Sequence, residues 1–314
     1  MKLIITVDTE ADNQWKNPDV FFYTNIKALP DFDKLCRKFD MVPTYLTTYD
    51  VLDDTESARI IKELHLRGSE VGSHLHSWST PPVPTDASSY IFSSELDTKT
   101  LNAQIEELTK KVLDVTDSSP TSFRGGRWSF TNEIGNKLAE LGYIVDSSVT
   151  PGVNWQRIIT KGNVSAAPNY ELYPVEPDML YFSGGKLLEV PMTIIQRSFM
   201  HRLHGLPRVI HNLPDKAKKI RQYITKPRWL RIFPETTAKD LIFVYTKAKA
   251  LRLPAIVFMI HSSELIKGGS PYTKTDAQVA HMYSVLEDFL AFASSDGAEG
   301  ITLSDFAKQY TQNI

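Results

Sequence analysis

The chain has 314 residues, of which 42% are hydrophobic and 23% charged, and its formal net charge is −2. This composition predicts a globular protein of one large or two modest domains, and the near balance of charge argues against a general nucleic-acid binder, which usually carries a basic excess. The single cysteine, Cys36, excludes a disulfide bond within the chain and fits a reducing compartment.

The N-terminal run 1–8 predicts a strand rather than a targeting segment. It lacks the long apolar region and the small-residue cleavage site of a signal peptide. No apolar run in the sequence approaches the roughly 20 residues that span a bilayer. We therefore expect a cytoplasmic protein, with the inner face of the membrane as an alternative location.

The first quarter of the chain alternates between predicted strands and helices. The β-branched run 2–7 is typical of a strand buried on both faces. Three acids, Asp8, Glu10 and Asp12, follow that strand. The next predicted elements are a helix at 31–39, a strand at 42–48, a helix from Asp54 or Thr55 to Gly68, and a strand at 68–78.

Two histidines at the end of the third predicted strand are spaced for a shared role. His74 and His76 are two residues apart, so an extended chain points both imidazoles to the same side. Neutral imidazole binds zinc and similar ions, and a catalytic zinc usually takes three protein ligands and a water. Taken alone, the pair fits two polar residues at the mouth of a strand better than it fits a metal site.

The middle of the chain continues the alternation. Apolar residues recur at helical spacing over 100–115, which predicts a helix. Arg124 and Trp128 then follow in the sequence Phe-Arg-Gly-Gly-Arg-Trp, and a helix capped by Thr131 ends at Gly142. The remaining predictions are a strand at 143–145 that ends at Asp146, long loops over 151–186, and a strand at 187–191.

The segment 197–235 differs from the rest of the chain in charge and is predicted to be an insertion. From Arg197 to Arg231 there are ten lysines and arginines against one acid, Asp215, with aromatic residues interleaved. Such a segment can hold phosphate or lie on an anionic membrane, and a solvated basic face is the alternative. The later elements are a helix at 240–251, a very apolar strand at 255–260 that ends at His261, and a final helix at 276–292.

Repeated strand–helix units predict a mainly parallel sheet or barrel in a single α/β domain over 1–314. In such barrels the loops after the strands converge on one mouth, where the chemistry takes place. One polar strand ending is common by chance, whereas five together predict a site. The five endings are Asp8 with Glu10, His74 with His76, Arg124, Asp146, and His261.

These five endings resemble, in the same order, the motifs of the polysaccharide deacetylase family, the NodB-homology carbohydrate esterases, over roughly residues 3–265. The resemblance implies a distorted (β/α) barrel, here with a basic, partly helical insertion before the last barrel strand. It also implies a metal-dependent hydrolase that cleaves a linear amide and removes an acetyl or similar acyl group from a sugar. Zinc is the expected metal, with cobalt, nickel and manganese as alternatives.

The resemblance assigns the base and the metal ligands. Asp8 corresponds to the general base and Glu10 to a metal ligand, with Asp12 as the alternative ligand, because the family's usual adjacent aspartates are spaced apart here. His74 matches the first histidine ligand. The family's second histidine stands four residues later, where this chain has a tryptophan, so His76 is inferred as its replacement.

The later motifs supply the remaining roles. Arg124 would orient the base, with Arg127 as the alternative. Asp146 would pair with His261, the general acid that protonates the leaving amine, because a carboxylate bonded to an imidazole fixes its tautomer and favours its charged form. The residues expected to contact the substrate are Trp78 and Trp128.

The expected substrate is an acylated amino sugar inside the cell. An intracellular glycan, or a lipid-linked or nucleotide-linked precursor of a surface polysaccharide, would suit, with contact to an anionic membrane through 197–231. Two rival functions stay open: hydrolysis of cyclic imides or ureides without a metal, which some branches of the family perform, and carbohydrate binding without catalysis. The sequence does not predict the oligomeric state.

Overall fold

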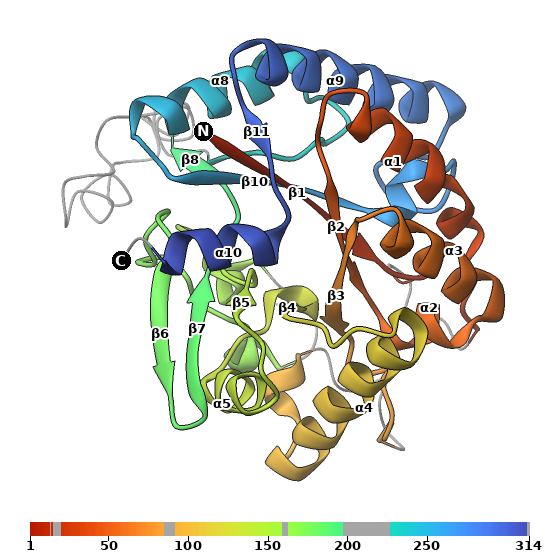
Figure 1. Ribbon diagram of the computed structural model, residues 1–314, viewed down its shortest axis with the longest axis vertical. Helices are drawn as coiled ribbons and strands as arrows, with labels where there is room; N and C mark the ends of the chain where they lie inside the picture. Colours follow the sequence, from red (N-terminus) through yellow and green to blue (C-terminus); the bar gives the residue numbers. More distant parts are fainter. Residues whose placement is uncertain (13, 15–19, 85–91, 159–162, 197–226, 313–314) are drawn as a thin grey trace.

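A single curled sheet carries almost all of the predicted strands. The computed structural model describes residues 1–12, 14, 20–84, 92–158, 163–196 and 227–312. Within these residues nine strands pair in the order β10-β1-β2-β3-β4-β5-β7-β6, with β11 beside β1 (Figure 1). The strands are β1 (Lys2–Thr9), β2 (Pro43–Thr47), β3 (Glu70–Leu75), β4 (Ser122–Gly125), β5 (Val145–Asp146), β6 (Asp178–Phe182), β7 (Gly185–Glu189), β10 (Ala255–His261) and β11 (Glu299–Gly300).

The pairing is parallel from β10 through β7, and among the strands of this sheet only β6 runs antiparallel to its neighbour. Parallel strands covered on both faces are near-continuous apolar runs, and β1 and β10 fit this rule because almost every residue in them is buried. The predicted α/β barrel is confirmed.

A two-stranded ribbon lies between the β7 side of the barrel and β10. It consists of β8 (Ile194–Gln196) and β9 (Pro227–Trp229), which pair antiparallel. The hydroxyl of Thr193 accepts a hydrogen bond from the backbone N–H of Val257 at 2.7 Å, and the carbonyl of Leu230 accepts one from the backbone N–H of Met259 at 3.3 Å. The ribbon therefore continues the barrel wall next to β10.

This ribbon corrects the limits of the predicted insertion. Residues 227–235, assigned from their charge to the insertion, form β9 and the connection to the next helix, so they belong to the barrel. Residues 197–226, which include most of the basic cluster and any helix within it, lie outside the described residues. No helix in the described part of the chain is long and apolar enough to span a bilayer.

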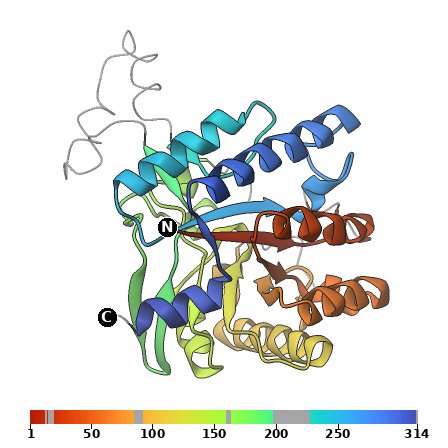
Figure 2. The same cartoon turned by 45° about the horizontal axis from the view of Figure 1, so that its top comes forward.

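Helices surround the sheet on its outer side, where they contact β10, β1, β2, β3 and β4 (Figures 1 and 2). The caps predicted at Asp54 and Thr131 are confirmed, because each side chain accepts a hydrogen bond from a backbone N–H of the first turn. The described α-helices are α1 (Leu29–Arg37), α2 (Tyr49–Asp53), α3 (Thr55–Leu66), α4 (Thr98–Thr116), α5 (Asn132–Glu140), α8 (Ala238–Ala250), α9 (Asp276–Ser295) and α10 (Leu303–Thr311).

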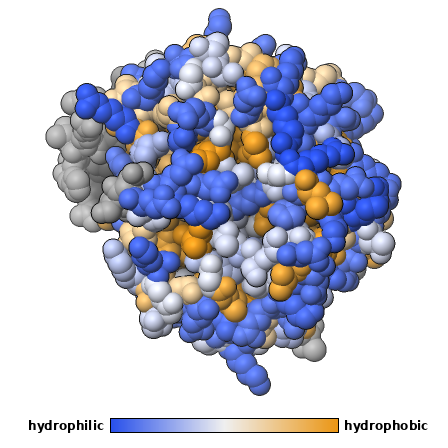
Figure 3. All heavy atoms as spheres, in the orientation of Figure 1, coloured by the Kyte–Doolittle hydropathy of each residue, from blue (hydrophilic) through white to orange (hydrophobic). Residues whose placement is uncertain are grey.

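One apolar core lies between the sheet and the outer helices, and a second fills the inside of the barrel. Ile4 of β1 and Met259 of β10 pack there with Leu303 and Phe306 of α10. Figure 2 shows α10 lying below the strands, and its apolar side faces this interior. The face of the molecule seen in Figure 1 is mostly hydrophilic, with small apolar areas (Figure 3). The helix therefore closes the end of the barrel where β1 and β10 begin, and polar side chains gather at the other end.

Two regions differ from the sequence-based expectations. The stretch 151–186 is predicted to be loops, yet it contains β6 and the start of β7, which form a hairpin with Gly185 at φ 145°. The helix at 276–292 is predicted to be the last, but α10 follows it. Strand β6 has only five residues, too few for a clear period. The apolar residues of α10 pack on Ile4 and Met259, which are distant in sequence.

Candidate active site

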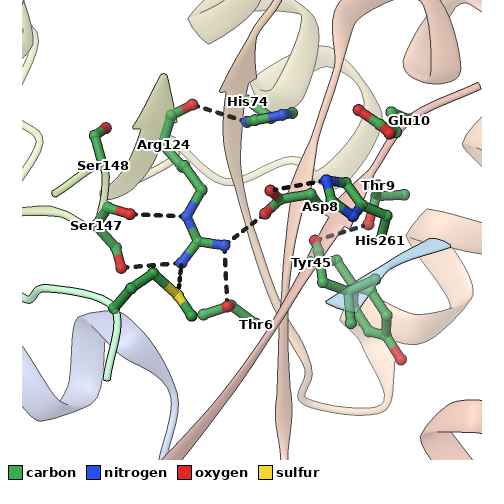
Figure 4. A network of polar contacts seen from close by, with 12 residues as sticks. Thr6, Asp8, Thr9, Glu10, Tyr45, His74, Arg124, Ser147, Ser148 and His261 are labelled. Carbon is green, nitrogen blue, oxygen red and sulfur yellow. Dashed lines mark hydrogen bonds and ion pairs between the residues drawn. The ribbon is translucent and has the colours of Figure 1, made fainter. Parts of the chain in front are cut away.

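The centre of the site is an ion pair between the ends of two strands. Asp8 lies near the end of β1 and Arg124 lies in β4, and Arg124 Nη1 is 2.5 Å from Asp8 Oδ1. Both side chains are almost completely buried. Figure 4 shows the guanidinium extending from β4 to the carboxylate. The structure thus places Arg124 on the predicted base, whereas the alternative, Arg127, lies over the ring of Trp78.

Every N–H of the Arg124 guanidinium has an acceptor. Nε donates to the carbonyl of Ser147, Nη1 to Thr6 and Asp8, and Nη2 to the hydroxyl of Ser147 and the sulfur of Met192. An arginine offers five such donors in a fixed plane. A buried charge is tolerated only when it is paired and its donors are satisfied, so this network fixes the position of the guanidinium.

The same network sets the charge of Asp8. Burial alone would raise the pKa of this carboxyl, but the positive charge of Arg124, with smaller effects from His74 and His261, outweighs burial and holds the pKa below its ordinary value. Asp8 is therefore a carboxylate at every ordinary pH. It can accept a proton or a hydrogen bond but has none to donate.

Beside Asp8, the three predicted ligands come together. Glu10, His74 and His76 each offer a ligand atom, all within 4.8 Å of one another, and all three side chains are buried. Nε2 of His76 is 3.1 Å from Nε2 of His74 and 3.4 Å from a carboxylate oxygen of Glu10. His76 lies just after β3 rather than in it, yet the spacing of two residues still directs both rings to one point.

The chemistry of this cluster fits a divalent cation. Burial lowers the pKa of both imidazoles, most strongly for His76, so they are in the neutral form that binds metals. His74 Nδ1 donates to the carbonyl of Arg124 at 2.9 Å, which leaves its Nε2 lone pair facing the cluster. These separations of 3.1 and 3.4 Å are close to the ~3.3 Å that separates two ligand atoms of a tetrahedral zinc ion.

The electrostatic surroundings of Glu10 also fit a bound cation. Burial and the negative charges of Asp8, Asp50 and Glu264 raise its pKa well above the ordinary value, so an added positive charge would stabilise its carboxylate. The alternative ligand, Asp12, is not in the cluster: its carboxylate accepts a hydrogen bond from the backbone N–H of Thr24 at 3.2 Å. Among the described residues, the cluster is therefore Glu10, His74 and His76.

The Gly-Gly pair after Arg124 has a role that sequence reasoning missed. A Cβ on Gly126 would lie 2.5 Å from His76 Cδ2 and 2.5 Å from the carbonyl of Leu75, so only glycine lets this turn pack on the imidazole. Arg127 and Trp128 follow with φ values of 52° and 63°. Backbone strain of this kind is concentrated at functional sites, and here it lies beside the cluster.

His261 has a different partner from the one predicted. Its Nδ1 lies 2.6 Å from a carboxylate oxygen of Glu264, three residues further along, and its Nε2 lies 3.9 Å from Asp8. The expected pairing with Asp146 is wrong. Glu264 stands at the start of the turn after β10, and the signal that could have found it is the spacing His-Ser-Ser-Glu, which lets a side chain reach back to the histidine.

Asp146 instead forms a buried pair of acids. It accepts hydrogen bonds from the hydroxyl of Ser148 at 2.7 Å and from the backbone N–H of Ser148 at 3.0 Å, and it lies opposite Glu189 of the neighbouring strand β7. Burial raises the pKa of both acids, and the Asp146 charge adds to the effect on Glu189. Two buried carboxylates side by side repel each other when both are ionised, so we infer that the pair shares one proton, which would join β5 to β7.

The predicted substrate contacts lie on either side of the centre. Trp78 stacks on His76 with ring centroids 4.3 Å apart, and Trp128 lies 5.4 Å from the guanidinium carbon of Arg124. Trp128 is nearly buried, and Tyr170 donates to its carbonyl at 2.6 Å. Two further indoles that sequence reasoning did not single out adjoin Trp128: Trp155 at 6.4 Å and Trp229 at 6.1 Å.

The fold is similar to that of solved proteins. A protein from Mycobacterium smegmatis described as a candidate polysaccharide deacetylase has a TM-score of 0.58 and 15% identity, over 100% of this chain and 92% of that one. The 4-alpha-glucanotransferase from Thermococcus litoralis has a TM-score of 0.55 and 12% identity, over 98% of this chain and 41% of that one. At these identities the likeness shows the fold alone, and it agrees with the barrel expected from the motifs.

A family 4 acetyl xylan esterase from Clostridium thermocellum, solved in complex with a cobalt ion, aligns with a TM-score of 0.48 and 11% identity, over 98% of this chain and 91% of that one. No protein-family model matches the sequence, and no curated protein matches it by sequence. The roles of the individual residues therefore depend on the geometry of this chain.

Loss of a ligand should abolish tight metal binding. We predict that Glu10→Gln and His74→Ala each weaken zinc affinity by at least ~100-fold, more than the ~10–100-fold typical of a lost outer-shell partner. Competition with a chromophoric chelator measures the affinity. Asp12→Asn is the matched control and should bind zinc like the unaltered protein. The assignment fails if Asp12→Asn loses zinc while Glu10→Gln retains it.

The buried acid pair should make stability depend on pH. Because the pKa of Glu189 in the folded protein lies well above its ordinary value of 4.5, folding retains a proton that the unfolded chain releases above that pH. The free energy of unfolding therefore falls as pH rises, by at most ~1.4 kcal/mol per pH unit for one proton. Glu189→Gln can donate its amide to Asp146 and should make this slope shallower by the contribution of one proton, while the contribution of Glu10, whose pKa is also raised, stays.

Urea unfolding at several pH values from mildly acidic to mildly alkaline tests this expectation. The exposed Glu176 lies in the same part of the chain, and Glu176→Gln should keep the slope of the unaltered protein. A Glu189→Gln variant that loses stability with rising pH as steeply as the unaltered protein would show that the two carboxyls do not share a proton.

Proposed function

We propose that the chain is a divergent relative of the polysaccharide deacetylases, a metal-dependent hydrolase that removes an acetyl or similar acyl group from the nitrogen of a sugar. One observation supports this proposal most strongly. A buried cluster of one carboxylate and two neutral imidazoles, Glu10, His74 and His76, stands next to a carboxylate, Asp8, that Arg124 keeps ionised. Two histidines and one glutamate are a ligand set of catalytic zinc sites in hydrolases, in which the fourth position stays open for water or substrate.

A divalent ion held by Glu10, His74 and His76 would supply a Lewis acid that polarises the acyl oxygen and makes water more acidic. Asp8 would take a proton from the attacking water as general base. Its low pKa makes it a weak base, so it suits water whose own pKa has been lowered. This favours the metal-dependent reaction over the rival hydrolysis of cyclic imides without a metal.

His261 would act as the general acid. The attack of water on the acyl carbon and the cleavage of the C–N bond release a carboxylic acid and an amine, and the amine needs a proton to leave. His261 Nε2 faces Asp8 across 3.9 Å, so the acid and the base lie on the same reaction centre. Glu264 takes the place in which Asp146 was expected, as the acceptor of His261 Nδ1–H.

The substrate, metal and location form the finer part of the proposal. We infer an acylated amino sugar linked to a lipid or a nucleotide, zinc as the metal, and action in the cytoplasm or at the inner face of the membrane by a single catalytic domain over 1–314. Trp78 beside His76 and Trp128 beside Arg124 support a sugar, because indoles stack on the apolar faces of rings. Membrane contact through 197–231 rests on sequence alone.

An assay of acetate release tests the function directly. The zinc-loaded protein should release acetate from UDP-N-acetylhexosamines or from N-acetylated oligosaccharides, and chelation should stop the release. Activity on a cyclic imide that survives chelation would support the first rival function. Binding of N-acetylated oligosaccharides without release of acetate would support the second rival function.

Asp8 should be essential for turnover but should not be needed for zinc binding. We predict that Asp8→Asn lowers kcat by ~10²–10⁴-fold, the usual contribution of a general base, while zinc affinity changes little. Acetate release and zinc titration on the same preparation measure both. Asp12→Asn is the matched control and should keep its activity, because the Asp12 carboxylate accepts from the backbone N–H of Thr24 and lies outside the Glu10–His74–His76 cluster. Full activity of Asp8→Asn would refute the role of Asp8.

A further inference from the structure

The site contains a second buried arginine, Arg231. Sequence reasoning assigned this residue to the basic insertion. It stands two residues after the end of β9, and its side chain is only 7% exposed. The guanidinium carbon lies 5.1 Å from the ring centre of Phe233 and 5.2 Å from that of Tyr272. Stacking on aromatic rings holds a guanidinium in a fixed plane, so Arg231 is positioned before it makes its polar contacts.

Arg231 makes its polar contact with Glu264, the residue that also pairs with His261. Arg231 Nη2 donates to a carboxylate oxygen of Glu264 at 2.6 Å, and the Glu264 side chain is 1% exposed. Burial alone would raise the pKa of Glu264, but Arg231, followed by His261, outweighs burial and lowers it. The arginine thus keeps Glu264 a carboxylate inside the protein, where an unpaired charge would be costly.

The distances also define which nitrogen of His261 carries the proton. Nδ1 lies 2.6 Å from the Glu264 oxygen and 3.0 Å from Arg231 Nη2. A ring nitrogen of a neutral imidazole either donates or accepts. Because the carboxylate can only accept and is the closer of the two, Nδ1 carries the proton and donates it to Glu264. Nε2 is then the nitrogen that faces Asp8.

We propose that Arg231 is a positioning residue that acts through Glu264 on His261. The Glu264 carboxylate keeps one proton on Nδ1 and so turns Nε2 toward the reaction centre, and the proton that the leaving amine takes is a second one, carried on Nε2 of the doubly protonated ring. This inference rests on the proposed function for its effect on catalysis, but its structural part stands without a substrate. It also gives the ribbon a role in the site, because Arg231 reaches His261 from just after β9 while Asp8 reaches it from β1.

The tautomer of His261 tests the structural part. Two-bond ¹H–¹⁵N spectra of protein labelled in its histidines distinguish Nδ1–H from Nε2–H when they are recorded at a pH at which the spectra show a neutral ring. His261→Gln assigns the signal. The unaltered protein should show Nδ1–H. In Arg231→Met the uncompensated Glu264 should take a proton and donate it to Nδ1, so the signal should change to Nε2–H.

Steady-state kinetics test the effect on catalysis. Arg231→Met should lower kcat by roughly 10- to 100-fold, a part of the ~10²–10⁴-fold that a general acid contributes, with KM nearly unchanged, and Arg231→Lys should recover part of the loss. Arg228→Met is the matched control: Arg228 lies in the same ribbon and pairs with Asp240 at 3.0 Å, so both the spectrum and kcat should stay the same.

The outcomes separate this inference from the proposed function. If Arg231→Met retains the Nδ1–H signal and full kcat, Arg231 is not a positioning residue. If the tautomer changes but the unaltered protein releases no acetate from any acylated sugar, the proposed function fails and the structural part stands. Arg231→Gln, which preserves a donor without the charge, replaces Arg231→Met if that variant does not fold, and the same change of tautomer is expected.

Discussion

The buried ion pair between Asp8 and Arg124 is the constraint on which the rest of the site depends. It joins β1 to β4 inside the barrel, and removal of one partner of such a pair typically costs about 3–5 kcal/mol because the other charge stays buried alone. Arg124 satisfies all of its donors on the surrounding strands, and its own carbonyl holds the ring of His74. The base and the first histidine ligand are thus oriented by one residue.

Much of the fold could be predicted because its signals are local. The apolar runs of β1 and β10, the caps at Asp54 and Thr131 and the helical period of α4 lie within short windows of sequence. Strand β6, the ribbon of β8 with β9, and α10 were missed. The three strands have only three to five residues each, the two strands of the ribbon are far apart in sequence, and α10 packs on β1 and β10.

The metal-binding part of the site could be predicted because few residue types bind metals. The partner of His261 could not, because many side chains can accept its hydrogen bond. Glu10, His74 and His76 were found because few side chains bind metals, and their order along the chain resembles known motifs. The partner of His261 was assigned wrongly, since any acid within reach can accept from an imidazole, and the turn after β10 puts Glu264 closer than Asp146. Gly126 and Arg231 were missed because their roles depend on contacts across the barrel.

The central claim is that Glu10, His74 and His76 hold a single catalytic cation beside an ionised Asp8. Anomalous X-ray diffraction from a crystal of the zinc-loaded protein tests it most directly. The account predicts one anomalous peak at bonding distance, about 2.0–2.2 Å, from a carboxylate oxygen of Glu10 and from Nε2 of both histidines, with an open side toward Asp8. A crystal without such a peak, or with zinc held by other side chains, would contradict it.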